Sequence, residues 1–122
     1  MINYLIVSLG AAIGGGLRYW FSGFVYKFLP STFPYGTMII NVLGSFVLGI
    51  VMFYLNEKEM ISHEVRLFLT VGFCGGFTTF STFSYETINL LKDAQYMGAA
   101  INVVLSVVLS LIGIYLAYII SR

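Results

Sequence analysis

Residues 72–84 read GFCGGFTTFSTFS, and this stretch decides the fold that we expect. It contains no charged residue, and it combines glycines with threonines, serines and phenylalanines in the third of four long apolar segments. A membrane-spanning helix is usually made mostly of residues such as leucine and valine. The composition of this stretch therefore indicates that the third segment has a role beyond crossing a bilayer.

The third segment is predicted to be an interrupted helix. The Gly75-Gly76 pair permits backbone dihedrals that other residues avoid, and the hydroxyl residues from Thr78 onward favour helix caps over helix interiors. We therefore expect the helix to break near residues 75–79 and to restart near residues 79–81. Such breaks are tolerated at membrane depth only where protein or water covers them. They expose carbonyls and half-helix ends that are suited to ions, and carbonyl oxygens suit a hard cation.

Composition places the whole chain in a bilayer. Of its 122 residues, 59% are hydrophobic and 9% are charged, and the mean hydropathy is +0.94. Soluble domains usually carry about 25% charged residues, whereas a membrane span needs roughly 20 mostly apolar residues. We therefore predict one all-α, multi-pass domain of the cell membrane over residues 1–122, with the lipid bilayer and no nucleic acid as a partner. The predicted helices lie near residues 3–26, 36–55, 65–92 and 96–120.

The first predicted helix carries small residues and one charge on a single face. Gly10, Gly14 and Arg18 recur at every fourth position. The two glycines form a pair that permits close packing of helices. A charge within a span normally faces a partner, water or the interface, but Arg18 could also extend toward the nearby helix end.

Polar residues follow the same four-residue period on the second and fourth predicted helices. The second carries Thr37, Asn41, Ser45 and Gly49. The fourth carries Gly98, Asn102, Ser106 and Ser110. Lipid cannot satisfy the amide of Asn41, so it needs a protein or aqueous partner, which could be one hydrogen bond that holds the bundle together. A serine can bond its own helix backbone, but three polar residues on one stripe favour a polar track or a polar interface.

Two phenylalanines follow the predicted break. Phe80 and Phe83 are three residues apart, so they share a face and lie roughly 4.5 Å apart along the helix axis. The edge of an aromatic ring is positive, and two ring edges turned toward a path would offer an anion weak, dry contacts. Phenylalanines at this spacing are also ordinary in a packed core.

These motifs together resemble the Fluc family of small fluoride channels. The resemblance rests on GGGLRYW, YGTMIINVLGSFVLG and above all GFCGGFTTFSTFSYE, in order along the chain. It implies an antiparallel, dual-topology homodimer in which two copies insert in opposite senses. It also implies that the chain is a channel for passive, selective fluoride export, which protects the cell from fluoride toxicity, and that it is not an enzyme.

The resemblance also assigns roles to residues. It implies a fluoride pathway lined by Asn41, Phe80, Phe83 and Ser110. Its weaker pathway candidates are Arg18, Thr82, Asn102 and Ser106. It further implies a structural sodium ion held by the backbone carbonyls of Gly75 and Thr78.

Two other functions fit the composition of the chain. A small proton-coupled multidrug exporter also has four helices, but it needs an acidic residue in its first helix, where this chain has only Arg18. Glu86, near the end of the third predicted helix, is a poor substitute. A non-conducting membrane scaffold would use the polar stripes only to join subunits.

The positive charges give almost no orientation bias. With four spans, the side that holds both termini carries Lys58, Arg66 and Arg122. The opposite side carries Lys27 and Lys92, together with Arg18 if it extends that way. Because the lysine and arginine bias of short loops sets orientation, we expect the chain to insert both ways in similar amounts.

Overall fold

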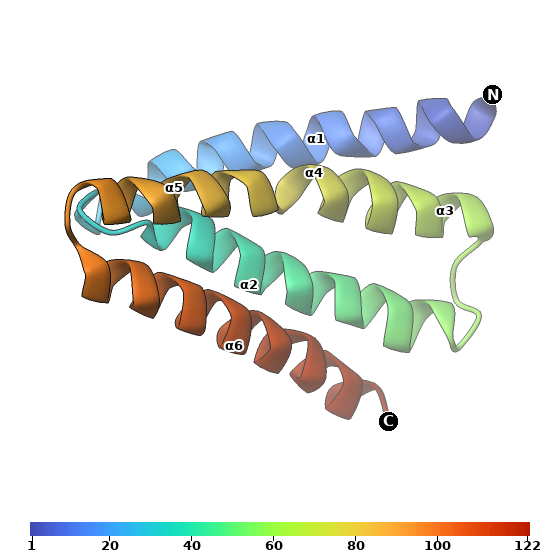
Figure 1. Ribbon diagram of the computed structural model, residues 1–122. Coiled ribbons are helices and arrows are strands. Elements are labelled where there is room, and N and C mark those ends of the chain that lie inside the picture. Colours follow the sequence, from blue (N-terminus) through green and yellow to red (C-terminus); the bar gives the residue numbers. More distant parts are fainter.

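The structure, a computed structural model that describes residues 1–122, consists of helices joined by short connections (Figure 1). The first helical segment is α1, Ile2–Val25. The second is α2, Tyr35–Gly49, which continues as a π-helical stretch over Ile50–Asn56. The last is α6, Tyr96–Ser121.

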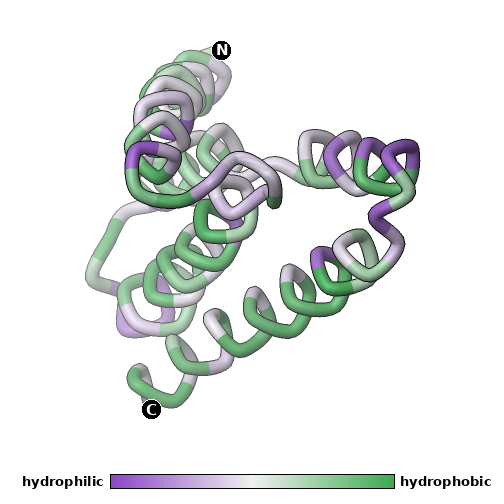
Figure 2. Tube along the Cα trace, turned by 90° about the vertical axis from the view of Figure 1, so that its left-hand side faces the viewer, coloured by the Kyte–Doolittle hydropathy of each residue, from purple (hydrophilic) through white to green (hydrophobic).

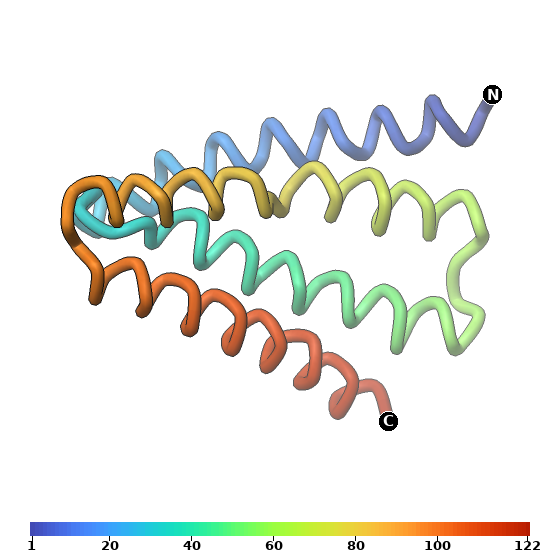
Figure 3. The backbone as a smooth tube through the Cα atoms, in the orientation of Figure 1, coloured from blue at the N-terminus to red at the C-terminus, as the bar shows by residue number.

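The third segment, residues 63–92, is built from several pieces. It begins with α3, His63–Leu67, where the hydroxyl of Ser62 caps the helix by accepting a hydrogen bond from the Val65 N–H at 3.2 Å. The helix continues through a π-helical stretch, Phe68–Cys74, and then α4, Gly75–Phe77. After an interruption it resumes as α5, Phe80–Lys92. The interruption is visible in the backbone tube of Figure 3.

Both termini and the connection between the second and third segments lie at one end of the bundle (Figure 1). The other two connections lie at the opposite end. The chain thus runs back and forth along one axis, and α2 packs against α6 while α1 packs against the third segment. The interruption of the third segment lies well away from either end of the bundle.

The outer surface of the bundle is apolar. Only 22 of the 122 residues are buried, although most side chains are hydrophobic. Figure 2 shows hydrophobic residues along the helices, with hydrophilic residues more frequent near their ends. A continuous exposed apolar surface of this kind fits lipid or a partner subunit and not water.

Three helices are long and apolar enough to cross a membrane. Their mean hydropathies are 2.2 for Tyr35–Asn56, 1.3 for His63–Lys92 and 2.6 for Tyr96–Ser121. The chain is therefore an all-helical, multi-pass membrane protein. α1 has 24 residues but is not among these three, because its glycines and Arg18 lower its hydropathy. A fourth span over α1 stays a prediction.

The backbone at the glycines of the third segment is ordinary, and Gly76 acts through its small size. Gly75 and Gly76 lie within helical backbone, and no glycine of the chain has a positive φ. The expectation that this pair breaks the helix through unusual dihedrals is therefore wrong. A Cβ at Gly76 would meet the Ala11 carbonyl of α1, and one at Gly14 would meet the Phe73 carbonyl. These glycines let α1 and the third segment approach to backbone contact.

Candidate functional site

The interruption of the third segment consists of two extended residues. Thr78 has φ −86° and ψ 159°, and Thr79 has φ −153° and ψ 115°. They separate the end of α4 at Phe77 from the start of α5 at Phe80. The interruption lies in the stretch where the sequence predicts it, but the threonines and not the glycines adopt the extended backbone.

Asn41 of α2 holds this interruption open. Its Oδ1 accepts a hydrogen bond from the Thr79 N–H at 2.8 Å, and its Nδ2 donates to the Thr79 carbonyl at 3.0 Å. In a continuous helix the Thr79 N–H would donate to the carbonyl of Gly75. The amide of Asn41 therefore replaces an intrahelical bond and leaves the Gly75 carbonyl without that donor.

The side chain of Thr79 has the same effect on the carbonyl of Thr78. Its Oγ1 accepts a hydrogen bond from the Thr82 N–H at 3.1 Å and so caps α5. In a continuous helix that N–H would donate to the carbonyl of Thr78. The Thr78 N–H and hydroxyl both donate to the Cys74 carbonyl, at 2.9 and 2.8 Å. The Gly75 and Thr78 carbonyls are thus deprived of their usual donors by side chains, and their oxygens stay available as ligands.

Arg18 also contacts the interruption. Its Nε donates to the Gly76 carbonyl at 3.0 Å, so the side chain reaches the third segment. The C-terminal end of a helix carries partial negative charge on its free carbonyls. A guanidinium at this place stabilises the end of α4 electrostatically as well as by the hydrogen bond.

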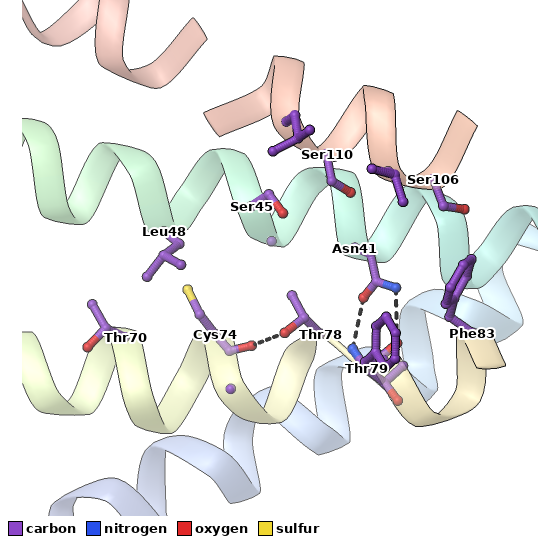
Figure 4. Close-up of a pocket in the computed structure, with 15 residues that line it drawn as sticks. Asn41, Ser45, Leu48, Thr70, Cys74, Thr78, Thr79, Phe83, Ser106 and Ser110 are labelled. Atoms are coloured by element: carbon purple, nitrogen blue, oxygen red, sulfur yellow. Dashed lines mark hydrogen bonds between the residues drawn. The ribbon is translucent and has the colours of Figure 1, made fainter. Parts of the chain in front are cut away.

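A groove runs along the interruption between α2, α6 and the third segment, with a volume of about 430 Å³. Figure 4 shows its walls, with Ser45 and Asn41 on α2 and Ser110 and Ser106 on α6. No charged residue lines it. It brings together seven of the residues to which the resemblance assigns a role: Asn41, Gly75, Thr78, Phe80, Phe83, Ser106 and Ser110.

The two phenylalanines of α5 lie in the groove wall but differ in exposure. Their ring centroids are 5.5 Å apart, with planes at 47°. Phe83 is buried, with 9% of its surface exposed, whereas 76% of Phe80 is exposed. Phe80 thus extends beyond the single chain and requires a cover of lipid or a partner.

The polar stripe of α6 is partly satisfied within the chain. Asn102 is buried, and its Nδ2 donates to the Thr87 hydroxyl at 2.9 Å. The hydroxyl of Ser106 donates to the Asn102 Oδ1 at 3.2 Å. Asn102 does not line the groove; it joins α5 to α6 and orients Ser106.

Arg18 and Thr82 lie outside the groove. They line a second pocket of about 290 Å³ that shares only Thr79 with the groove. The same pocket contains Glu86, whose Oε1 is buried without a hydrogen-bond partner. Sequence reasoning did not include Thr79 or Glu86 among the site residues. Their spacing was the available signal, because Thr79, Thr82 and Glu86 recur at three and four residues.

Comparison with known proteins gives matches over nearly the whole chain. Residues 5–118 match the family described as CrcB-like protein, Camphor Resistance (CrcB). A Geobacter metallireducens protein named Fluoride-specific ion channel FluC is 43% identical over 122 residues, covering 100% of this chain and 98% of the relative. A protein of the same name from Pelobacter propionicus is 45% identical over 122 residues, covering 100% of this chain and 95% of the relative.

Proposed function

This chain belongs to the CrcB-like protein family, and from that premise we propose that it is a fluoride-specific channel through which fluoride leaves the cell passively. Export through it protects the cell against fluoride toxicity. The relatives that carry this name match the chain from end to end. The observation that supports the proposal is the groove, because two phenylalanine rings, an amide and several hydroxyls line it beside one interrupted helix at the predicted motif.

The fluoride pathway follows this groove. Asn41 uses one N–H of its amide on Thr79, and the other N–H of an amide group is free to donate to an anion. Ser110 and the edges of Phe80 and Phe83 supply further positive contacts along the same walls. Ser106 forms part of the wall, and the buried Asn102 supports it.

Arg18 and Thr82 belong to a separate approach to the interruption. Both line the second pocket, and a guanidinium there raises the local concentration of anions. Arg18 would therefore contribute through its charge and Thr82 through its hydroxyl, in a pocket that meets the groove at Thr79.

The functional unit is an antiparallel homodimer. The open groove and the exposed ring of Phe80 leave the single chain incomplete on this face. Antiparallel pairing about a two-fold axis in the membrane plane would bring the two interruptions together, since an isologous interface repeats the same surface on both subunits. The nearly equal lysine and arginine counts at the two ends of the bundle permit both insertions.

A structural sodium ion would fit between the two interruptions. The carbonyl oxygens of Gly75 and Thr78 are the ligands, and they have lost their usual helical donors to Asn41 and Thr79. Two such carbonyls from each copy would surround a hard cation with oxygen, which is the ligand type that such cations prefer. Bound there, sodium would hold the two subunits together.

A liposome experiment tests the function. Purified protein is reconstituted in vesicles loaded with potassium fluoride, and efflux is followed with a fluoride electrode after valinomycin sets the potential. Rapid efflux that needs no proton gradient is expected. Efflux equal to that of empty vesicles would support the scaffold, and proton-driven uptake of an organic cation would support the exporter.

A second experiment tests the antiparallel pairing. Two or three lysines added to the connection at residues 93–95 should force one orientation. We expect this biased chain to be inactive alone and active when it is co-expressed with a chain biased the opposite way. Full activity from one strictly oriented population would contradict the antiparallel dimer.

A further inference from the structure

The hydroxyls that line the groove differ in how they are satisfied. Most of them hydrogen-bond within the chain: Thr70 to the Arg66 carbonyl, Thr78 to the Cys74 carbonyl, Thr79 to Thr82 and Ser106 to Asn102. Ser45 and Ser110 also line the groove, and their side chains form no hydrogen bond within the chain. These two hydroxyl groups are therefore free to donate a hydrogen bond to a ligand in the groove.

The free hydroxyl of Ser45 contrasts with those of Ser84 and Ser121 in the same chain. A serine or threonine within a helix commonly donates to the carbonyl four residues earlier. Ser84 and Ser121 do so, at 3.0 and 2.7 Å. The equivalent acceptor for Ser45 is the carbonyl of Asn41, and that bond is not formed. The side chain instead lines the groove together with Asn41 and Ser110 (Figure 4).

The position of Ser45 continues the line of donors on α2. Ser45 follows Asn41 by four residues, so it lies on the same helix face and about 6 Å farther along the axis. The groove extends in that direction, past the interruption, to Leu48 and Thr70. α6, which packs beside α2, presents Ser110 to the same groove (Figure 4).

We propose that Ser45 binds fluoride directly and, together with Ser110, extends the pathway one helical turn beyond the interruption. No lysine or arginine lines the groove, so an anion there depends on neutral donors to replace its water. Hydroxyls and the free N–H of Asn41 are the donors that the walls supply. This inference rests on the proposed function, and it adds Ser45 to the residues of the proposed fluoride pathway.

The test compares Ser45→Ala with the parent and with Ser8→Ala in the fluoride-efflux assay. Ser8 is exposed on α1, away from the groove, and it undergoes the same chemical change. Dimer content is measured by cross-linking in the same vesicles, and the rate is expressed per dimer. We expect Ser45→Ala to slow efflux about tenfold, since a hydrogen bond to a charged group is lost, with dimer content and Ser8→Ala unchanged. Ser45→Thr keeps the hydroxyl and should restore most of the rate.

A double-mutant cycle with Ser110→Ala examines whether both hydroxyls contact the same ion. The combined loss should then be smaller than the product of the single losses. An efflux rate for Ser45→Ala within twofold of the parent, or a loss that merely follows the loss of dimer, would overturn the inference while the parent still conducts. A parent without efflux would instead overturn the proposed function, so the two failures are distinguishable.

Discussion

Replacing Asn41 by leucine should close the interruption of the third segment. Leucine has the same number and branching of side-chain heavy atoms but cannot bond the Thr79 N–H and carbonyl, which now lie 2.8 and 3.0 Å from the Asn41 amide. Each buried polar group that loses its partner costs about 1–3 kcal/mol. The Thr79 carbonyl loses its partner outright, and the Thr79 N–H regains one only if the interruption is reshaped, so we take the lower part of this range for each group, about 2–3 kcal/mol in total.

Thermal unfolding in detergent measures this loss. For a chain of this size, 1 kcal/mol shifts the melting temperature by about 3–5 °C. The expected decrease for Asn41→Leu is therefore about 6–15 °C, read as the temperature at which half of the protein leaves the dimer peak in size-exclusion chromatography. A decrease below about 2 °C would refute the role of Asn41 in holding the interruption.

The same substitution should also abolish stabilisation by sodium. Without Asn41, the Thr79 N–H can return to the Gly75 carbonyl and remove that oxygen from the proposed cation site. In the parent, a bound ion raises stability according to its concentration relative to its dissociation constant, so sodium should raise the melting temperature above that in N-methylglucamine chloride. Asn102→Leu is the matched control, because Asn102 bonds only side chains; it should lower stability but retain the sodium effect. A full sodium effect in Asn41→Leu would contradict the freed Gly75 carbonyl.

Three further predictions concern packing, capping and conduction. Gly14→Ala should weaken the contact of α1 with the third segment and lower the melting temperature. Gly16→Ala is the control: a Cβ there has nothing within 4 Å, so this change should be neutral or raise stability by up to ~1 kcal/mol. Equal melting temperatures for the two variants would contradict the close approach. Thr79→Val removes the cap of α5 and should lower stability by about 1 kcal/mol, which Thr79→Ser should largely restore. Phe80→Ile and Phe83→Ile keep apolar bulk but remove the ring edges, so fluoride efflux should fall strongly while cross-linking still detects dimers. Efflux equal to that of the parent in both variants would show that the rings take no part in the mechanism.

The sequence by itself determined the class of the protein and the place of the interruption. Long apolar segments specify membrane helices because each residue contributes to partitioning independently of distant contacts. The threonines after Phe77 could be assigned to a helix cap for a similar reason, since capping depends on the side chain and the backbone next to it. The resemblance carried by the same motif identified the family, which the full-length matches confirm.

Only the tertiary structure decided what the interruption presents to its surroundings. The donor that would have bonded the Gly75 carbonyl is bound by Asn41, which lies 38 residues away in the sequence. The role of Gly76 likewise depends on the backbone of α1 at Ala11 and not on its own dihedrals. Local propensity indicates where a helix is weak. The acceptor for each freed donor and the space beside each glycine depend instead on segments that meet only when the helices pack.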